Sequence, residues 1–200
     1  MSYAELNTAD STLSESGIGD VRLSGRYTAF NIDAPGKTIR LAPFFGVELA
    51  TGKHNINQAL NLGSGSYDFF VGVVATYATT NWMTDTQFSY QKNGGSNDID
   101  IGDSFHIDSS LQYRIIPKAL TINTKSFVNA VVELNIINQQ ETTQNSIKNN
   151  NASTQVLIAP GLQYISQRWI AETSLQIPLN SDDSTLQTDY IARIGIRANF

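Results

Sequence analysis

A short stretch of the chain brings together the three residue types of a hydrolase triad: His106, Asp108 and Ser110. If this stretch is a β-strand, the three side chains alternate onto one face. His106 and Ser110 are then about 13 Å apart, too far for the strand to form a Ser–His–Asp triad alone. A lipid hydrolase would need these groups to converge from neighbouring strands, so we expect that the chain is not an enzyme. Loss of a lipase activity in His106→Ala would overturn that expectation.

Metal and phosphate chemistry have little support in the sequence. Two distant histidines, His54 and His106, without any cysteine argue against a zinc site. The Gly-rich stretch 62–66 has no lysine and precedes a strand pattern, so it is not a phosphate loop. Two small acidic groups contain oxygen ligands for Ca²⁺, but solvated acidic loops are far commoner. They are Asp182 with Asp183, and Asp98 with Asp100 and Asp103. We therefore expect no cofactor and no metal.

The composition is that of a strand-rich protein with polar loops. Charged residues make up 16% of the 200 residues, against about 25% in ordinary soluble domains, and aromatic residues make up 10%. The length predicts a single domain, residues 1–200. No apolar run reaches about 18 residues, which excludes a transmembrane helix. A transmembrane barrel remains open because dyad alternation dilutes every hydropathy window.

Charge and cysteine content exclude further classes. The net charge is −5 and no basic stripe is present, so we expect no nucleic-acid partner. With no cysteine, there is no disulfide framework and no thiol chemistry. Residues 1–17 show neither a basic nor an apolar signal-peptide region. For an exported protein we therefore expect that the signal was removed or that the chain begins part-way through a longer protein.

The elements that would position the polar side chains are strands. Apolar and polar residues alternate in nine segments, and none has a convincing helical period of 3.6. All are longer than the five or six residues usual in soluble domains, and about nine to eleven tilted residues cross a bilayer. The segments are 19–30, 37–50, 66–78, 82–92, 98–116, 124–138, 153–165, 167–180 and 186–200.

The connections between these segments alternate in length. The four shorter turns fall on one side of the predicted sheet, near 33–36, 80–81, 117–118 and 166–167. The two longest loops, 51–65 and 139–152, fall on the other side. Outer-membrane barrels have short periplasmic turns and longer external loops, so this alternation favours a membrane barrel.

Charges are sorted between the two faces of the segments. In the last segment Tyr190, Ile194 and Phe200 share an apolar face, and Arg193 and Arg197 lie opposite. Six of the seven arginines lie on the polar face of a segment, whereas all six lysines lie in connections or at segment ends. A lipid-facing arginine costs about 2–4 kcal/mol at the bilayer midplane, so a membrane would enforce this sorting.

We therefore predict a set of channel-lining residues with six arginines and six carboxylates. Arginine suits forked pairing with carboxylates in a confined space. A soluble sandwich with charged outer faces is the alternative, but it would carry lysine as readily as arginine in mid-strand. Asp103 falls on the apolar face, which is tolerable only beyond the bilayer. The predicted lining residues are Arg22, Arg26, Arg40, Glu48, Asp68, Asp85, His106, Asp108, Arg114, Glu133, Glu172, Arg193 and Arg197.

Aromatic residues and prolines add detail to this prediction. Aromatic side chains fall mostly near segment ends on the apolar face, as in the girdles at bilayer interfaces. Pro43, Pro160 and Pro178 lie inside segments, where proline removes a ladder hydrogen bond. We expect a bulge or local break at each of them.

Several short Gly-rich motifs form a further pattern. They are SGIGDV at 16–21 leading into LSGRY at 23–27, GVELATG at 46–52, LGSGSYD at 62–68, IGD at 101–103 and the terminal Phe200. Together they resemble the outer-membrane β-barrel "transporter" family of the MetA pathway of phenol degradation. The resemblance implies hydrophobic or aromatic substrates, and a signal peptide and further strands before the Gly-Asp strand.

The resemblance and the strand number predict a truncated barrel. Bacterial single-chain barrels have even strand numbers, and nine is odd. We expect either a barrel of about 12 strands that lacks its N-terminal part, or a ten-stranded barrel completed by residues 1–6. A sheet left open in lipid would have costly unpaired edges.

The sequence thus predicts an all-β, antiparallel, up-and-down transmembrane barrel in the outer membrane of a Gram-negative bacterium. Its function would be passive transport of small-molecule solutes through a charged lumen. Its partners would be membrane lipid and, through the C-terminal strand ending at Phe200, the barrel-assembly machinery. The alternative is a structural or adhesive barrel with a lumen closed by Arg–carboxylate pairs and functional loops at 51–65 and 139–152.

Overall fold

The protein is an all-β structure with antiparallel sheets in every part that is described. The computed structural model describes residues 2–7, 12–52, 63–96, 99–180 and 190–198. In these ranges all regular elements are strands. They include no helix of the length and apolar character needed to cross a membrane.

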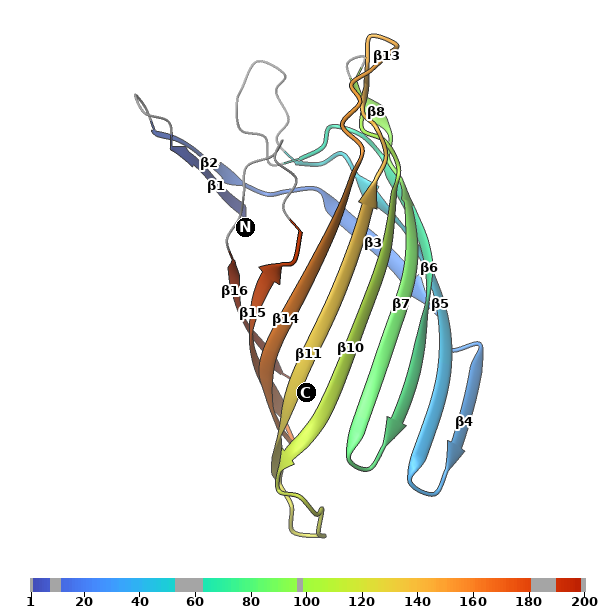
Figure 1. Ribbon diagram of the computed structural model, residues 1–200, viewed down its shortest axis with the longest axis vertical. Coiled ribbons are helices and arrows are strands. Elements are labelled where there is room, and N and C mark those ends of the chain that lie inside the picture. Colours follow the sequence, from blue (N-terminus) through green and yellow to red (C-terminus); the bar gives the residue numbers. More distant parts are fainter. Residues whose placement is uncertain (1, 8–11, 53–62, 97–98, 181–189, 199–200) are drawn as a thin grey trace.

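The main sheet is a meander in which each long strand pairs with its neighbours in sequence (Figure 1). Its order is β16-β15-β14-β11-β10-β7-β6-β5-β3, and β4 pairs with the other half of β5. The strands are β3 (Val21–Arg26), β4 (Phe30–Ala34), β5 (Lys37–Leu49), β6 (Asp68–Thr79), β7 (Trp82–Lys92), β10 (Ser104–Ile116), β11 (Ser126–Gln139), β14 (Ser153–Ser166), β15 (Trp169–Pro178) and β16 (Ile191–Ala198).

Within the described residues, the nine predicted segments are confirmed as strands, with three changes; residues 98, 186–189 and 199–200 of these segments lie outside the described residues. β3 and β4 together form the first segment, which reaches Ala34 and not residue 30. The predicted strand 98–116 is split by residues 101–103 into β9 (Ile99–Asp100) and β10. The predicted loop 139–152 contains a hairpin of its own, β12 (Thr143–Gln144) and β13 (Ile147–Lys148). Local pairing of polar residues, which has no hydrophobic alternation, made this hairpin invisible in the sequence.

Two smaller sheets complete the structure. β8 (Gly95–Ser96), β9, β12 and β13 form a four-stranded sheet in which β9 pairs with β12. β1 (Ser2–Asn7) and β2 (Thr12–Gly17) form a separate hairpin. One of the two predicted barrels has ten strands and is completed by residues 1–6. In the described residues, however, β1 pairs with β2 and not with a strand of the main sheet.

The connections sort as predicted between the two ends of the sheet. Those after β4, β6, β10 and β14 lie at the lower end in Figure 1, and the described parts of those after β7 and β11 lie at the upper end, where β5 and β15 also end. The lower connections are two-residue turns, except the one between Ile116 and Ser126. In this longer connection, the Arg114 side chain donates to the carbonyl of Pro117.

The main sheet is curved and its two faces differ in chemistry. Large apolar side chains on one face are exposed, among them Phe45 (70%), Leu111 (53%) and Ile194 (85%). The opposite, concave face contains the buried hydrophobic residues of the described part and the predicted charged set. The buried ones are Ala42, Phe44, Phe70, Leu157 and Ala159. The β3/β4 edge and the β16 edge are not paired with each other, so the described strands form an open sheet.

The three prolines interrupt the ladder as predicted. Pro43 faces the gap between β3 and β4, where the Tyr27 N–H donates to the Pro43 carbonyl at 3.1 Å. At Pro160 the ladder between β14 and β15 lacks two pairs, although the register before and after is the same. Pro178 is the last residue of β15. In each case the missing N–H falls where strand pairing stops or pauses.

Candidate functional site

The structure places all thirteen predicted residues on the concave face of the main sheet. Residues opposite each other in an antiparallel ladder share a face, and the registers join the set across the strands. Arg22 is opposite Glu48, which is opposite Asp68. Arg40 and Asp85 both lie opposite Thr76. The prediction from alternation therefore holds for orientation, whereas the predicted Arg–carboxylate pairing holds for one pair.

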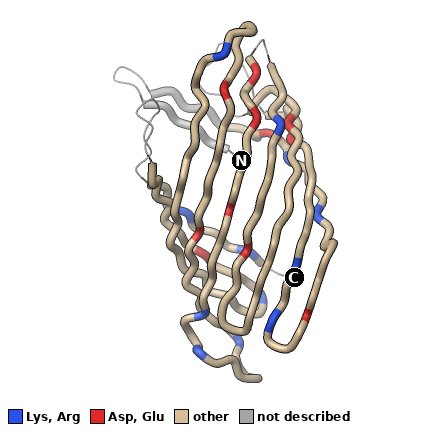
Figure 2. Tube along the Cα trace, turned by 45° about the vertical axis from the view of Figure 1, so that its right-hand side comes forward, with Lys and Arg blue, Asp and Glu red and all other residues tan. Residues whose placement is uncertain are grey.

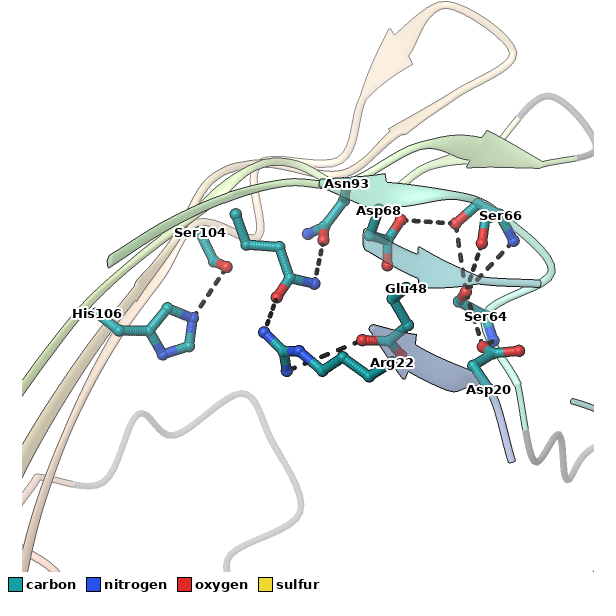
Figure 3. Close-up of polar contacts among 10 residues, drawn as sticks. Asp20, Arg22, Glu48, Ser64, Ser66, Asp68, Asn93, Ser104 and His106 are labelled. Atoms are coloured by element: carbon teal, nitrogen blue, oxygen red, sulfur yellow. Dashed lines mark hydrogen bonds and ion pairs between the residues drawn. The ribbon is translucent and has the colours of Figure 1, made fainter. Parts of the chain in front are cut away.

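That pair lies at the upper end of the sheet (Figure 3). Arg22 Nη1 is 3.9 Å from Glu48 Oε2, and Arg22 Nη2 donates to Gln91 at 3.3 Å. Among the described residues, Arg40 pairs instead with Asp33 on β4, the other strand of its own hairpin, at 3.8 Å. The other predicted carboxylates have no cation within 4 Å in the described part of the chain. The concave face is therefore not closed by ion pairs in this structure.

The arginines of β3 lie against an interlocked group of two phenylalanines and two glycines. Phe44 is opposite Gly72 and Phe70 is opposite Gly46, so each ring covers a glycine of the next strand. The guanidinium of Arg22 lies 3.9 Å from the centroid of Phe70. The ring thus holds the cation by a cation–π contact and fixes where it points. We call Phe44, Gly46, Phe70 and Gly72 the Phe–Gly interlock.

A cluster at the upper end gathers the Gly-rich motifs around Asp20, and we call it the Asp20 cluster. Asp20 Oδ1 accepts from the Gly52 N–H at 2.7 Å, and Oδ2 accepts from the Ser64 N–H at 2.6 Å and hydroxyl at 3.0 Å. The chain of bonds continues through Ser66, whose hydroxyl donates to Asp68 at 2.9 Å (Figure 3). The motif residues noted in the sequence thus connect three strands through one carboxylate.

The pKa of Asp20 is lower than usual for this carboxyl. Partial burial raises it, but the N–H groups of Gly52 and Ser64 and the Ser64 hydroxyl lower it more. Because the folded pKa lies below the unfolded one, the cluster stabilises the fold above the unfolded pKa. That stability is lost as the pH falls through the folded pKa.

We expect Asp20→Asn to lower stability at pH 7 by about 1–2 kcal/mol, because hydrogen bonds to a charged acceptor are replaced by weaker ones. The difference from the parent should be smaller at an acidic pH below the folded pKa of Asp20, where the carboxyl is protonated in both states. Thermal unfolding in detergent at the two pH values measures it. Asp100→Asn, an exposed carboxylate of β9, is the control. An equal loss at both pH values would show that the charge of Asp20 is unimportant.

A second polar cluster surrounds the IGD motif. Asp103 accepts from the Tyr90 hydroxyl and, at 3.2 Å, from the Asn93 N–H. The Gly102 carbonyl accepts from Asn93 Nδ2 at 2.8 Å and from the side chain of Gln139. Asp103 therefore lies just before the first residue of β10, in the upper connections.

Arg114 has a different role from the other arginines. Its side chain is buried, and it donates to Asn81 Oδ1 at 2.6 Å and to the Pro117 carbonyl at 3.1 Å. It joins two lower connections and lies at the edge of a small concavity there. Arg114 was predicted as a lining residue because it lies on the same face. Its guanidinium N–H groups, however, donate to oxygen atoms of the turns.

The triad residues do not come together on β10. His106 Nε2 is 3.0 Å from Ser104 Oγ, and Asp108 accepts from Asn135 at 2.8 Å and from Gln87 at 3.4 Å. The described residues contain no group of three or more His, Cys, Asp or Glu side chains placed to hold a metal ion. His54 and the acidic pair Asp182–Asp183 lie outside the described residues, as does Asp98.

Two concavities of about 480 Å³ each lie in the middle of the charged face. One, the central concavity, is lined by Arg26, Arg40, Asp85, Asp108 and Glu133 together with neutral side chains. The other lies between β11 and β16 and contains Glu172 and Arg193. Both signs of charge thus face the same space in each concavity. The sequence predicted the residues but had no means to show which strands face one another across the curve.

Comparison with models of protein families identifies the family of the chain. A family model described as "Putative MetA-pathway of phenol degradation" matches residues 2–185. A search of curated proteins found no match.

Proposed function

The chain belongs to the family described as the MetA pathway of phenol degradation, and from that premise we propose that it forms a β-barrel channel of a bacterial outer membrane. In this proposal the apolar face of the main sheet contacts lipid and the charged face lines a lumen for passive diffusion of small solutes. The edges formed by β3 with β4 and by β16 are closed in the membrane, directly or through further strands.

The observation that carries the proposal is the exposure of the apolar face. Leu41, Val71, Leu175 and Ile194 would pack in a dry interior if two stacked sheets formed a soluble sandwich. Their exposed fractions are 41%, 55%, 39% and 85%. Soluble proteins rarely expose an apolar patch of this extent to water, whereas the hydrocarbon of a bilayer would cover it.

Strand length and aromatic placement also support a membrane setting. β5, β6, β7, β10, β11, β14 and β15 have 10 to 14 residues each, enough to cross a bilayer when tilted. Tyr77 packs on Trp82 with centroids 5.0 Å apart, and Tyr164 on Trp169 with centroids 4.9 Å apart. Both pairs lie beside the lower turns, where an interfacial girdle is expected.

The charged residues of the concave face suit the lining of a channel. The carboxylates Asp85 and Asp108 are hydrogen-bonded to neutral side chains and have no cation within 4 Å among the described residues. Such rings of charge set the field in a pore. The family description favours aromatic solutes, whereas this surface suits polar solutes at least as well.

Planar-bilayer recording tests the proposal. We expect the purified, folded protein to give discrete steps of current that are absent from bilayers without protein. Folding should first be checked by far-ultraviolet circular dichroism. Folded protein without current would contradict the channel and favour the structural or adhesive alternative, in which the loops 51–65 and 139–152 are functional.

A further inference from the structure

The central concavity has arginines at one side and carboxylates at the other side. Arg26 and Arg40 enter it from β3 and β5, whereas Asp85, Asp108 and Glu133 enter it from β7, β10 and β11. Figure 2 shows that basic and acidic positions occur along the strands of the sheet and not in the loops alone. Any solute that occupies this space therefore meets cations on one side and anions on the other.

The acidic side of the concavity is ordered but not neutralised. Asp85 accepts from the Thr76 hydroxyl, and Asp108 accepts from Asn135 and Gln87, all of them uncharged groups. Asp85 and Glu133 both lie opposite Ser110, so they are in one row of the sheet, two strands and roughly 10 Å apart. No cation lies within 4 Å of these three carboxylates in the described part of the chain.

The basic side is held in place by its own contacts. Arg40 Nε donates to Asn31 at 3.0 Å, and its Nη2 is 3.8 Å from Asp33. The guanidinium of Arg26 lies 5.7 Å from the centroid of Phe44, and no carboxylate is within 4 Å of it among the described residues. Arg26 therefore keeps its donors for an anion. Three carboxylates against two guanidiniums leave the concavity with a formal charge of −1.

We infer that the central concavity is a solute subsite for small basic amino acids, of which L-lysine is the simplest probe. The α-carboxylate binds Arg26 and Arg40, and the ammonium groups bind Asp85, Asp108 and Glu133. Lysine carries one carboxylate and two ammoniums, so its charge complements that of the concavity. Its four-carbon stem separates the side-chain ammonium from the carboxylate, as the two-strand spacing between Arg40 and Asp85 along one row of the sheet requires. The inference rests on the proposed channel function.

Uptake into proteoliposomes tests the subsite. Radiolabelled L-lysine, L-glutamate and the neutral sugar arabinose are compared with the same preparation. We expect lysine to enter at least about threefold faster than glutamate, because the uncompensated carboxylates raise the local concentration of cations. In the double variant Asp85→Asn/Glu133→Gln this ratio should fall to about one, with both rates divided by the arabinose uptake of the same preparation.

Two further variants make the test specific. Glu141→Gln also removes one carboxylate, but Glu141 pairs with Lys148 at 3.2 Å in the upper connections, so the ratio should be kept. Arg26→Gln should raise the lysine concentration at half-maximal uptake about threefold, whereas that of 1,5-diaminopentane, which lacks the carboxylate, should not rise. An equal change for both solutes would show that Arg26 does not bind the carboxylate.

The outcomes separate the subsite from the channel. If arabinose enters but the lysine-to-glutamate ratio is one, or is unaffected by the double variant, the subsite is wrong and the channel stands. If folded protein passes no arabinose, the channel is wrong. The subsite is then judged by calorimetric titration of the detergent-folded protein with L-lysine. Saturable binding that the double variant abolishes would support it, and absence of binding would overturn it.

Discussion

Leu111→Arg is expected to destabilise the membrane-inserted protein by about 2–4 kcal/mol, whereas Gln112→Arg should cost less than about 1 kcal/mol. The two residues are neighbours in the middle of β10 and point to opposite faces. Leu111 is 53% exposed on the apolar face, and Gln112 lines the concavity between β11 and β16 on the charged face. In a barrel, only the first substitution places a guanidinium in hydrocarbon.

Urea titration of the protein folded into lipid vesicles measures this difference. The pair of variants is matched in the residue introduced, the strand and the depth along it. A soluble sheet would give a different result, because an arginine at an exposed position of a water-covered face costs little. If Leu111→Arg is as stable as Gln112→Arg, the apolar face does not contact lipid, and the membrane proposal fails.

Gly46→Ala is expected to destabilise the protein by about 1–3 kcal/mol, because a methyl group at this position has no space. A Cβ at Gly46 would meet both the Phe70 ring and the backbone carbonyl of Leu23. The ring could turn aside, but the carbonyl belongs to the ladder between β3 and β5. The substitution must therefore disturb the Phe–Gly interlock and the strand that carries Arg22 and Arg26.

Gly25→Ala is the matched control for this prediction. Gly25 lies on the neighbouring strand, on the apolar face, and a Cβ there would have the Phe45 ring as its nearest neighbour at 3.7 Å, an ordinary contact. We expect its stability to change by less than about 0.5 kcal/mol or to rise, since alanine lowers the entropy of the unfolded chain. Equal losses in chemical denaturation would mean that both glycines serve only the backbone.

The Phe–Gly interlock also relates stability to the proposed subsite. Phe44 is buried over Gly72 and faces the guanidinium of Arg26, which lines the central concavity. A change in the packing of the ring therefore changes the position of a solute-binding cation. Gly46→Ala should accordingly alter lysine uptake even in the fraction of protein that folds.

The sequence by itself determined the strands and the chemistry of their faces. A strand has a side-chain period of two, so alternation assigns each residue to a face without knowledge of its partners. For this reason the orientation of Arg40, Asp85 and Glu133 was predicted correctly, and the breaks at Pro43 and Pro160 followed from their missing N–H groups. The Gly-rich motifs likewise indicated the family. That Asp20 accepts from the N–H groups of Gly52 and Ser64 could not be predicted from the sequence.

Only the tertiary structure decided which of these residues meet. Ladder register and sheet curvature depend on pairing between strands far apart in the chain, which alternation does not encode. The structure therefore separated Arg22, paired with Glu48, from Arg114, bound to turn carbonyls, and brought Arg26 and Glu133 into one concavity. The small sheet of the upper connections was not predicted from the sequence either, because short polar strands such as β9 and β12 are defined by backbone pairing alone.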